Sequence, residues 1–137
     1  MATAESCTGG GIGAALTAVP GSSAIFKGGI ISYCDEIKQS LLGVDKDLLS
    51  SVGAVSAQVA EAMARGAREA LCTDIAVSVT GLAGPGADAF GNPVGTVFVG
   101  YADEKIQCSE HHLFSGTRDQ IRQKAMEAAL LLILKHN

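Results

Sequence analysis

The residues best suited to chemistry stand near the N-terminus, where Ser6 and Cys7 open a glycine-rich stretch. Thr8, Gly9 and Gly10 follow directly, so a hydroxyl, a thiol and several backbone N–H groups lie close together. Because N–H groups at a helix start stabilise negative charge, the stretch suits either a nucleophile that attacks a carbonyl or a phosphate site. No Gly-Lys-Ser/Thr follows, which argues against a P-loop. Glycines that let a helix pack closely on a sheet explain the same pattern.

Both candidate nucleophiles need activation. A helix start beside Cys7 would lower the pKa of its thiol, whereas Ser6 needs a base within hydrogen-bond reach. The three histidines fall late in the chain, and none follows a strand end that faces Ser6, so a Ser-His-Asp triad is disfavoured. A lysine can be the base when burial lowers its pKa, and a tyrosine can hold or relay the proton. Lys38, five residues after Tyr33, makes the best such pair; a solvated lysine and a core tyrosine are the structural alternative.

Four further residues could hold a substrate. Thr80 ends an expected strand, and Gly84 lies in a glycine-rich loop whose backbone can approach a ligand closely. Arg118 and Arg122, four residues apart at the start of the last expected helix, could grip a phosphate or carboxylate, although a solvated helix face explains them equally well. The acidic residues form no convincing metal constellation, so we expect no metal.

These residues depend on alternating strands and helices. We expect strands over 2–5, 26–33, 74–80, 96–101 and 105–113, the last two forming an antiparallel hairpin. We expect helices over 9–19, 36–42 with Asp35 as its N-cap, 45–52, 56–71 and from 117 or 118 to the end. This order predicts an α/β fold, a three-layer α/β/α sandwich around a mixed, mostly parallel sheet of about five strands. Since parallel strands bring their carboxyl ends to one edge, Ser6, Tyr33 and Thr80 should meet there.

Length and composition restrict the class of protein. With 137 residues and no linker, residues 1–137 are expected to form a single domain. The net charge of −4 argues against direct nucleic-acid binding, and no apolar run is long enough to cross a membrane. Nothing resembles an export signal, and the widely spaced cysteines suit reduced thiols, so we expect a cytoplasmic protein. Because the first strand begins almost at the first residue, we expect support from a second subunit in a homo-oligomer.

Seven ordered motifs together carry a family resemblance that covers nearly the whole chain. They are Thr3-Ala4-Glu5-Ser6-Cys7-Thr8-Gly9-Gly10, Gly28-x4-Tyr33-x4-Lys38, Gly43-Val44, Gly53-Ala54-Val55-Ser56, Thr80-Gly81-x-Ala83-Gly84-Pro85, Pro93-Val94-Gly95-Thr96-Val97 and Phe114-x-Gly116-x-Arg118-x2-Ile121-Arg122. In this respect the chain resembles the CinA C-terminal domain family. Domains of that family carry a further N-terminal helix before the first strand, which we expect to be missing here.

The resemblance implies a reaction and roles for the site residues. Enzymatic members of the family hydrolyse the amide of nicotinamide mononucleotide to nicotinic acid mononucleotide and ammonia, a step in pyridine nucleotide recycling that needs no metal or organic cofactor. By similarity Ser6 is the nucleophile, Lys38 the general base and Tyr33 its partner. Gly9 and Gly10 with neighbouring amides would cradle the oxyanion or the substrate, and the remaining candidates (Cys7, Thr8, Thr80, Gly84, Arg118 and Arg122) would help to bind the nucleotide.

Two alternatives to the amidase stay open. One is a non-catalytic nucleotide-binding or interaction domain of a competence- or damage-inducible protein, because family members also serve such roles. The other is thiol chemistry centred on Cys7.

Overall fold

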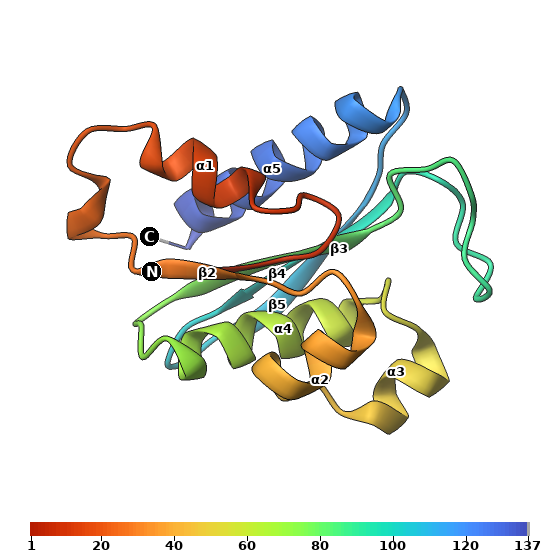
Figure 1. Cartoon of the computed structure of the whole chain (residues 1–137), viewed down its shortest axis with the longest axis horizontal. Helices are drawn as coiled ribbons and strands as arrows, with labels where there is room; N and C mark the ends of the chain where they lie inside the picture. Colours follow the sequence, from red (N-terminus) through yellow and green to blue (C-terminus); the bar gives the residue numbers. More distant parts are fainter. Residues whose placement is uncertain (137) are drawn as a thin grey trace.

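The computed structural model describes residues 1–136 and consists of one five-stranded sheet between two layers of helices (Figure 1). Helices α1 (Gly11–Thr17) and α5 (Arg118–Lys135) cover one face of the sheet. Helices α2 (Asp35–Leu42), α3 (Lys46–Val52) and α4 (Ala57–Ala70) lie on the other face. A single-turn 3-10 helix, η1 (Ser22–Ala24), follows α1. This architecture confirms the predicted three-layer α/β/α sandwich.

The strands run in the order β2-β1-β3-β4-β5 across the sheet. Their bounds are β1 (Ala2–Glu5), β2 (Gly28–Ile31), β3 (Ala76–Gly81), β4 (Thr96–Ala102) and β5 (Gln107–Leu113). Strand β1 pairs in parallel with both β2 and β3, whereas β4 is antiparallel to β3 and to β5. Four strands therefore point the same way and only β4 opposes them, which confirms the mixed, mostly parallel sheet and the terminal hairpin.

Polar side chains fix the starts of three helices. The Asp45 carboxylate accepts hydrogen bonds from two N–H groups of α3, and the Ser56 hydroxyl accepts one from Val59 in α4. Thr117 and Gln120 form a reciprocal capping box at the start of α5. The predicted cap of α2 is wrong, because Asp35 is the first helical residue and Cys34 occupies the N-cap position without a side-chain cap. From its place in the first turn, Asp35 faces Lys38 one turn later.

Apolar side chains fill the space on both faces of the sheet. Because side chains alternate along a strand, Val77 and Val79 of β3 point to α1 and α5, while Ala76 points to α4. The buried face of α5 consists of Ile121, Ala125, Ala128, Ala129 and Leu132. In α4 Val59, Met63 and Ala67 lie in the core, whereas Ala70 at the end of the helix is exposed.

One glycine lets two helices on the second face approach closely. A Cβ atom at Gly66 in α4 would overlap the backbone of Leu42 at the end of α2. The close contact fixes α2 beneath the sheet edge and so sets the position of its Lys38. No helix in the described part of the chain is long and apolar enough to cross a membrane.

Candidate active site

A cleft of about 320 Å³ lies at the edge of the sheet where β1 and β3 end. Its lining comes from the turn after β1, the start of α2, the loop that follows β3 and the start of α5, and comprises Ser6, Cys7, Tyr33, Asp35, Lys38, Ala54, Val55, Thr80, Gly81, Leu82, Ala83, Gly84, Pro85, Gly86 and Arg118. The structure thus brings the predicted strand-end residues Ser6, Tyr33 and Thr80 to one cleft, as parallel strands in an α/β fold do.

Ser6 and Lys38 contact each other at the bottom of this cleft. Lys38 Nζ lies 3.4 Å from Ser6 Oγ and donates a hydrogen bond of 2.9 Å to the carbonyl of Ser32. The Lys38 side chain is almost fully buried, and Ser6 is 8 % exposed. Ser6 is held in place by its own N–H, which donates to the carbonyl of Val79 in β3. The structure therefore places the candidate base Lys38 within reach of the candidate nucleophile Ser6.

Burial lowers the pKa of Lys38 below its ordinary value of 10.5, because a charged ammonium loses its hydration there. The Asp35 carboxylate, 3.8 Å from Lys38 Nζ, partly opposes this shift. A lysine with a lowered pKa is neutral in a larger fraction of molecules near neutral pH, and neutral Nζ has the lone pair that a general base needs. The site can therefore take a proton from a serine hydroxyl.

The buried carboxylate of Glu5 occupies the start of α1. It accepts hydrogen bonds from the Thr8 hydroxyl (2.7 Å) and from the N–H groups of Gly10 (3.0 Å), Ile12 (3.0 Å) and Gly13 (2.9 Å). The helix start that suggested an anion site thus already holds an anion supplied by the protein. Sequence reasoning missed this role, although an acidic residue just before a helix start is the signal that could have revealed it.

The cradle predicted from Gly9 and Gly10 with neighbouring amides is therefore only partly available, because Gly9 and Gly10 use their N–H groups within the protein. Gly10 N–H and the Thr8 hydroxyl are bonded to Glu5, and Gly9 N–H donates to the carbonyl of Ser6 at 3.0 Å. Positive φ angles at Gly9 (58°) and Gly10 (99°) show why glycine suits both positions of this turn. The glycines shape the turn that carries Ser6, and their N–H groups bond within the protein.

Two other N–H groups beside Ser6 remain unused. Within residues 1–136, the N–H of Thr8 has no acceptor, and the N–H of Cys7 meets only its own sulfur. The residue after a nucleophile commonly supplies an N–H to an oxyanion hole. These two groups are the donors that the turn leaves for a reacting oxygen.

Cys7 is a buried neighbour of the site. Burial raises the pKa of its thiol to about 11, against smaller opposing effects of its own N–H and of Arg122. The expected lowering of this pKa is therefore wrong, because the loss of hydration on burial outweighs the effects that lower it. A thiol that stays protonated is a poor nucleophile.

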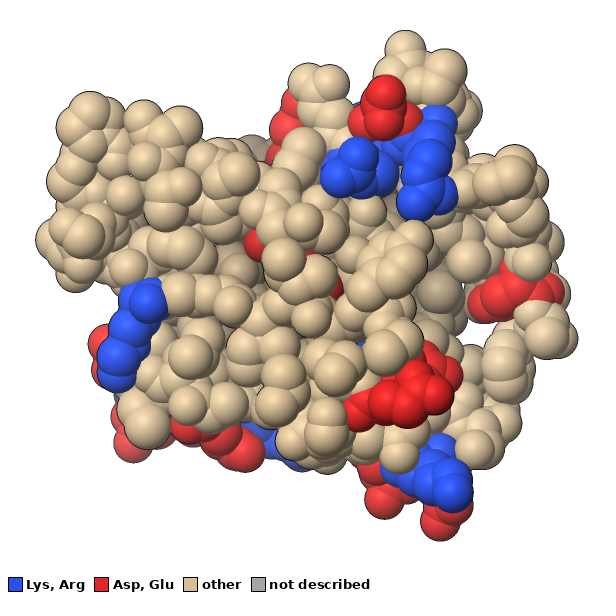
Figure 2. Space-filling model, viewed as in Figure 1, with Lys and Arg blue, Asp and Glu red and all other residues tan. Residues whose placement is uncertain are grey.

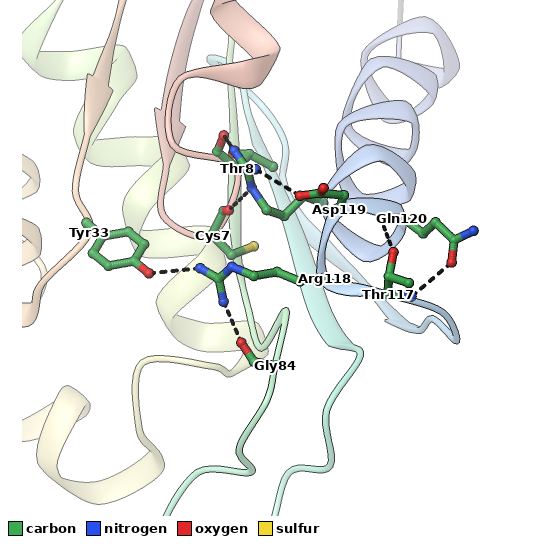
Figure 3. Close-up of polar contacts among 9 residues, drawn as sticks. Cys7, Thr8, Tyr33, Gly84, Thr117, Arg118, Asp119 and Gln120 are labelled. Carbon is green, nitrogen blue, oxygen red and sulfur yellow. Dashed lines mark hydrogen bonds and ion pairs between the residues drawn. The ribbon is translucent and has the colours of Figure 1, made fainter.

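Tyr33 stands at the rim and contacts Arg118. Its hydroxyl accepts a hydrogen bond of 3.3 Å from Arg118 Nη2, and Arg118 Nη1 donates to the carbonyl of Gly84 on the opposite loop (Figure 3). Tyr33 is 63 % exposed, which excludes the core tyrosine of the structural alternative. In the described residues its hydroxyl has no hydrogen bond to Ser6 or Lys38. Arg118 therefore bridges two walls of the cleft.

Thr80 and Arg122 hold backbone around the site. The Thr80 hydroxyl donates to the carbonyl of Ala54 at 2.8 Å and is almost fully buried. Arg122 does not line the cleft; it binds the carbonyls of Cys7 and Thr8 from the far side of the turn.

Charge is unevenly distributed around the cleft. Figure 2 shows basic side chains together at the end of the molecule where α5 begins, and an uncharged surface over α1 and the turn that follows it. An anionic group entering the cleft would therefore find its cations at the start of α5. Among the described residues, no three His, Cys, Asp or Glu side chains gather as metal ligands.

Fold and site together define an α/β domain with a serine nucleophile candidate and a buried lysine at the carboxyl edge of a parallel β-sheet. The family model described as the CinA C-terminal domain matches residues 1–136. The chain belongs to the CinA C-terminal domain family, which confirms the resemblance seen in its motifs.

Individual relatives have two kinds of name. The chain is 47 % identical over 130 residues to the nicotinamide-nucleotide amidohydrolase PncC of Pseudomonas putida, a match that covers 95 % of this chain and 81 % of that protein. It is 59 % identical over 102 residues to a CinA-like protein of Cyanothece sp., which covers 74 % of this chain and 24 % of the relative. The chain thus spans about a quarter to a third of the CinA-like relatives that it matches.

Solved structures share the whole fold. A CinA superfamily protein of Escherichia coli superposes with a TM-score of 0.96 at 32 % identity, over 99 % of this chain and 79 % of that one. The competence/damage-inducible protein CihA of Agrobacterium tumefaciens gives a TM-score of 0.90 at 39 % identity, over 98 % of this chain and 82 % of that one.

Proposed function

We propose that this protein hydrolyses the carboxamide of nicotinamide mononucleotide and releases nicotinic acid mononucleotide and ammonia. The observation that carries the proposal is the 3.4 Å contact between Lys38 Nζ and Ser6 Oγ in a cleft with a cation at its rim. The relative named nicotinamide-nucleotide amidohydrolase, most of whose length this chain covers, supports the choice of substrate.

The first half of the reaction follows from the positions of three groups. Neutral Lys38 Nζ takes the proton of Ser6 Oγ while Oγ bonds to the amide carbon and the carbonyl electron pair moves to oxygen. The N–H groups of Cys7 and Thr8 stabilise this oxyanion. Lys38 then gives its proton to the leaving nitrogen, so that ammonia departs and an ester with Ser6 remains.

The second half repeats the same proton transfers with water. Lys38 takes a proton from a water molecule as its oxygen bonds to the ester carbon, and returns that proton to Ser6 Oγ as the ester bond breaks. The product carboxylic acid leaves with the ribose phosphate unchanged. Ser6, Cys7 and Lys38 line the cleft, and Thr8 adjoins Cys7 in the same turn. Tyr33 and Arg118 at the rim are assigned to substrate binding.

The direct test measures ammonia from nicotinamide mononucleotide, its riboside and free nicotinamide. We expect Ser6→Ala and Lys38→Met each to lower kcat at least about a thousandfold while circular dichroism and the unfolding temperature show a folded protein. Lys46→Met, an exposed lysine on α3, is the matched control and should keep full activity. Full activity of Ser6→Ala would overturn the proposal, and tight binding of the mononucleotide without ammonia would identify a non-catalytic nucleotide-binding domain instead.

The proposal also covers where the protein acts and whether it self-associates. A role in pyridine nucleotide recycling in the cytoplasm agrees with the free cysteines, two of which (Cys34 and Cys72) are exposed. Exposed apolar side chains favour the self-association expected from the sequence. They lie after α1 (Val19), after η1 (Ile25) and on α5 (Leu131 and Leu134). Light scattering coupled to size-exclusion chromatography tests this, and a monomer at high protein concentration would contradict it.

A further inference from the structure

Arg122 is engaged inside the protein through all of its guanidinium nitrogens. Nε donates to the carbonyl of Cys7 at 3.0 Å, and Nη2 donates to the carbonyl of Thr8 at 3.2 Å. Nη1 lies 3.7 Å from the Asp119 carboxylate. Arg122 is thus held against the turn and does not line the cleft, whereas Arg118 does.

The carbonyls that Arg122 holds belong to the turn directly after Ser6. A peptide unit is planar and trans, so its N–H points away from its C=O. The carbonyl of Cys7 shares a peptide plane with the N–H of Thr8. By holding that carbonyl toward α5, Arg122 turns the Thr8 N–H away from α5. The preceding peptide is fixed in the same manner, because Gly9 N–H holds the carbonyl of Ser6.

The N–H that Arg122 orients lacks an acceptor in the described part of the chain. Thr8 is fully buried, and a buried backbone N–H without a partner is both uncommon and costly. Such a cost is understandable where a reacting oxygen supplies the acceptor during catalysis. The positive guanidinium also polarises the Cys7–Thr8 peptide, which strengthens its N–H as a donor.

We propose that Arg122 is a positioning residue that holds the Cys7–Thr8 peptide so that its N–H stabilises the oxyanion formed on the substrate carbonyl. The inference rests on the proposed amidase function and replaces phosphate binding as the role of Arg122. In the step concerned, Ser6 Oγ bonds to the carbonyl carbon, the carbonyl electron pair moves to oxygen and the proton moves to Lys38. Arg122 touches neither Oγ nor the substrate.

Steady-state kinetics distinguishes the two roles of Arg122. Positioning predicts that Arg122→Gln lowers kcat for nicotinamide mononucleotide by about 10- to 100-fold while KM changes by less than about threefold. Phosphate binding predicts the reverse, a raised KM with kcat retained, and that result would overturn the inference. Arg65→Gln, an exposed arginine on α4, is the matched control and should match the wild type.

A conservative variant separates loss of positioning from loss of folding. Arg122→Lys keeps a positive charge but loses the rigid planar fork in which Nε and Nη2 each donate to a separate carbonyl. We expect its kcat to lie between those of the wild type and Arg122→Gln, with an unfolding temperature near that of the wild type. A lysine variant with a wild-type kcat would show that the fixed peptide orientation is unnecessary and would overturn the inference.

A second measurement does not depend on turnover. In pyridine-3-boronic acid, boron accepts an electron pair from Ser6 Oγ while Lys38 takes the proton, which gives a tetrahedral anion like the oxyanion intermediate. We expect Arg122→Gln to bind this probe at least about tenfold more weakly than the wild type, with unchanged affinity for nicotinic acid mononucleotide. Equal affinity for the boronate, or none in the wild type, would overturn the inference. A wild type that binds the boronate more tightly than the variant but releases no ammonia would refute only the proposed function.

Discussion

Lys38 Nζ lies 3.4 Å from Ser6 Oγ, although the two residues are 32 positions apart in the chain. Ser6 directly follows β1 and Lys38 lies in α2, so the contact depends on α2 packing closely against α4 at Gly66. Burial of that lysine links its protonation both to the reaction and to the stability of the fold.

The activity should rise with pH as Lys38 loses its proton. Because burial lowers the pKa of Lys38, the midpoint of kcat/KM against pH should lie below 10.5. Asp35→Asn removes the carboxylate that opposes this shift and should move the midpoint to lower pH. The exposed Asp74→Asn should leave it in place. A midpoint that moves upward in Asp35→Asn would contradict the assignment of Lys38 as the base.

The free energy of unfolding should also depend on pH through Lys38, and it should rise as the pH rises. Since the folded pKa of Lys38 is below 10.5, the unfolded chain binds more protons between these two pKa values. The wild type should therefore gain stability relative to Lys38→Met as pH rises through this window toward 10.5, by at most about 1.4 kcal/mol per pH unit. Urea unfolding of both proteins at pH 7, 8, 9 and 10 measures the difference, and a constant difference would rule out the coupling.

Glu5→Gln should destabilise the protein. The amide retains one oxygen, but its NH2 group would face the N–H donors of Gly10, Ile12 and Gly13 or the Thr8 hydroxyl. Leaving such buried donors unpaired should lower the free energy of unfolding by about 3 kcal/mol. Chemical denaturation measures this loss, and Glu69→Gln on the exposed face of α4 serves as the control. A change as small as that of the control would show that the carboxylate does not hold the turn.

Arg118→Gln should weaken substrate binding selectively. Its guanidinium lies at the cleft rim, where it donates hydrogen bonds to the Tyr33 hydroxyl and the Gly84 carbonyl and can reach a phosphate. Loss of a charged hydrogen bond of about 1.5–3 kcal/mol should raise KM for the mononucleotide about 10- to 100-fold. Activity toward the riboside, which lacks the phosphate, should hardly change. Equal losses for both substrates would place the phosphate elsewhere.

Alkylation should spare Cys7. With a pKa of about 11, roughly one Cys7 thiol in three thousand is ionised at pH 7.5, and the side chain is buried. Iodoacetamide at this pH should modify the exposed Cys34 and Cys72 first, as peptide mass spectrometry can follow, without inactivating the protein. Inactivation that tracks modification of Cys7 would revive the thiol mechanism.

The sequence predicted the fold and the approach of Ser6 to Lys38 because both depend on strand order. Alternating apolar residues identified β3 and β4, and parallel strands necessarily bring their carboxyl ends together. Once the helix after β2 was recognised, a lysine in its first turns had to lie near Ser6.

The use of individual polar groups could not be predicted in the same way. The glycines after Ser6 have the composition of an anion site, and only the folded chain shows that the Glu5 carboxylate fills it. Likewise, Arg118 and Arg122 are one helical turn apart, yet one faces the cleft and the other faces the back of the turn. A rotation of about 40° between positions four residues apart, together with side-chain direction, decides this difference.

The grip of Arg122 on Cys7 and Thr8 joins residues more than a hundred positions apart. During synthesis strand β1 and the turn with Ser6 emerge before α5, the helix that carries Arg122. A nascent chain still lacking α5 would hold both Ser6 and Lys38 but not the arginine that orients the adjoining peptide. In the proposed amidase, full activity would then arise only once α5 docks against the turn.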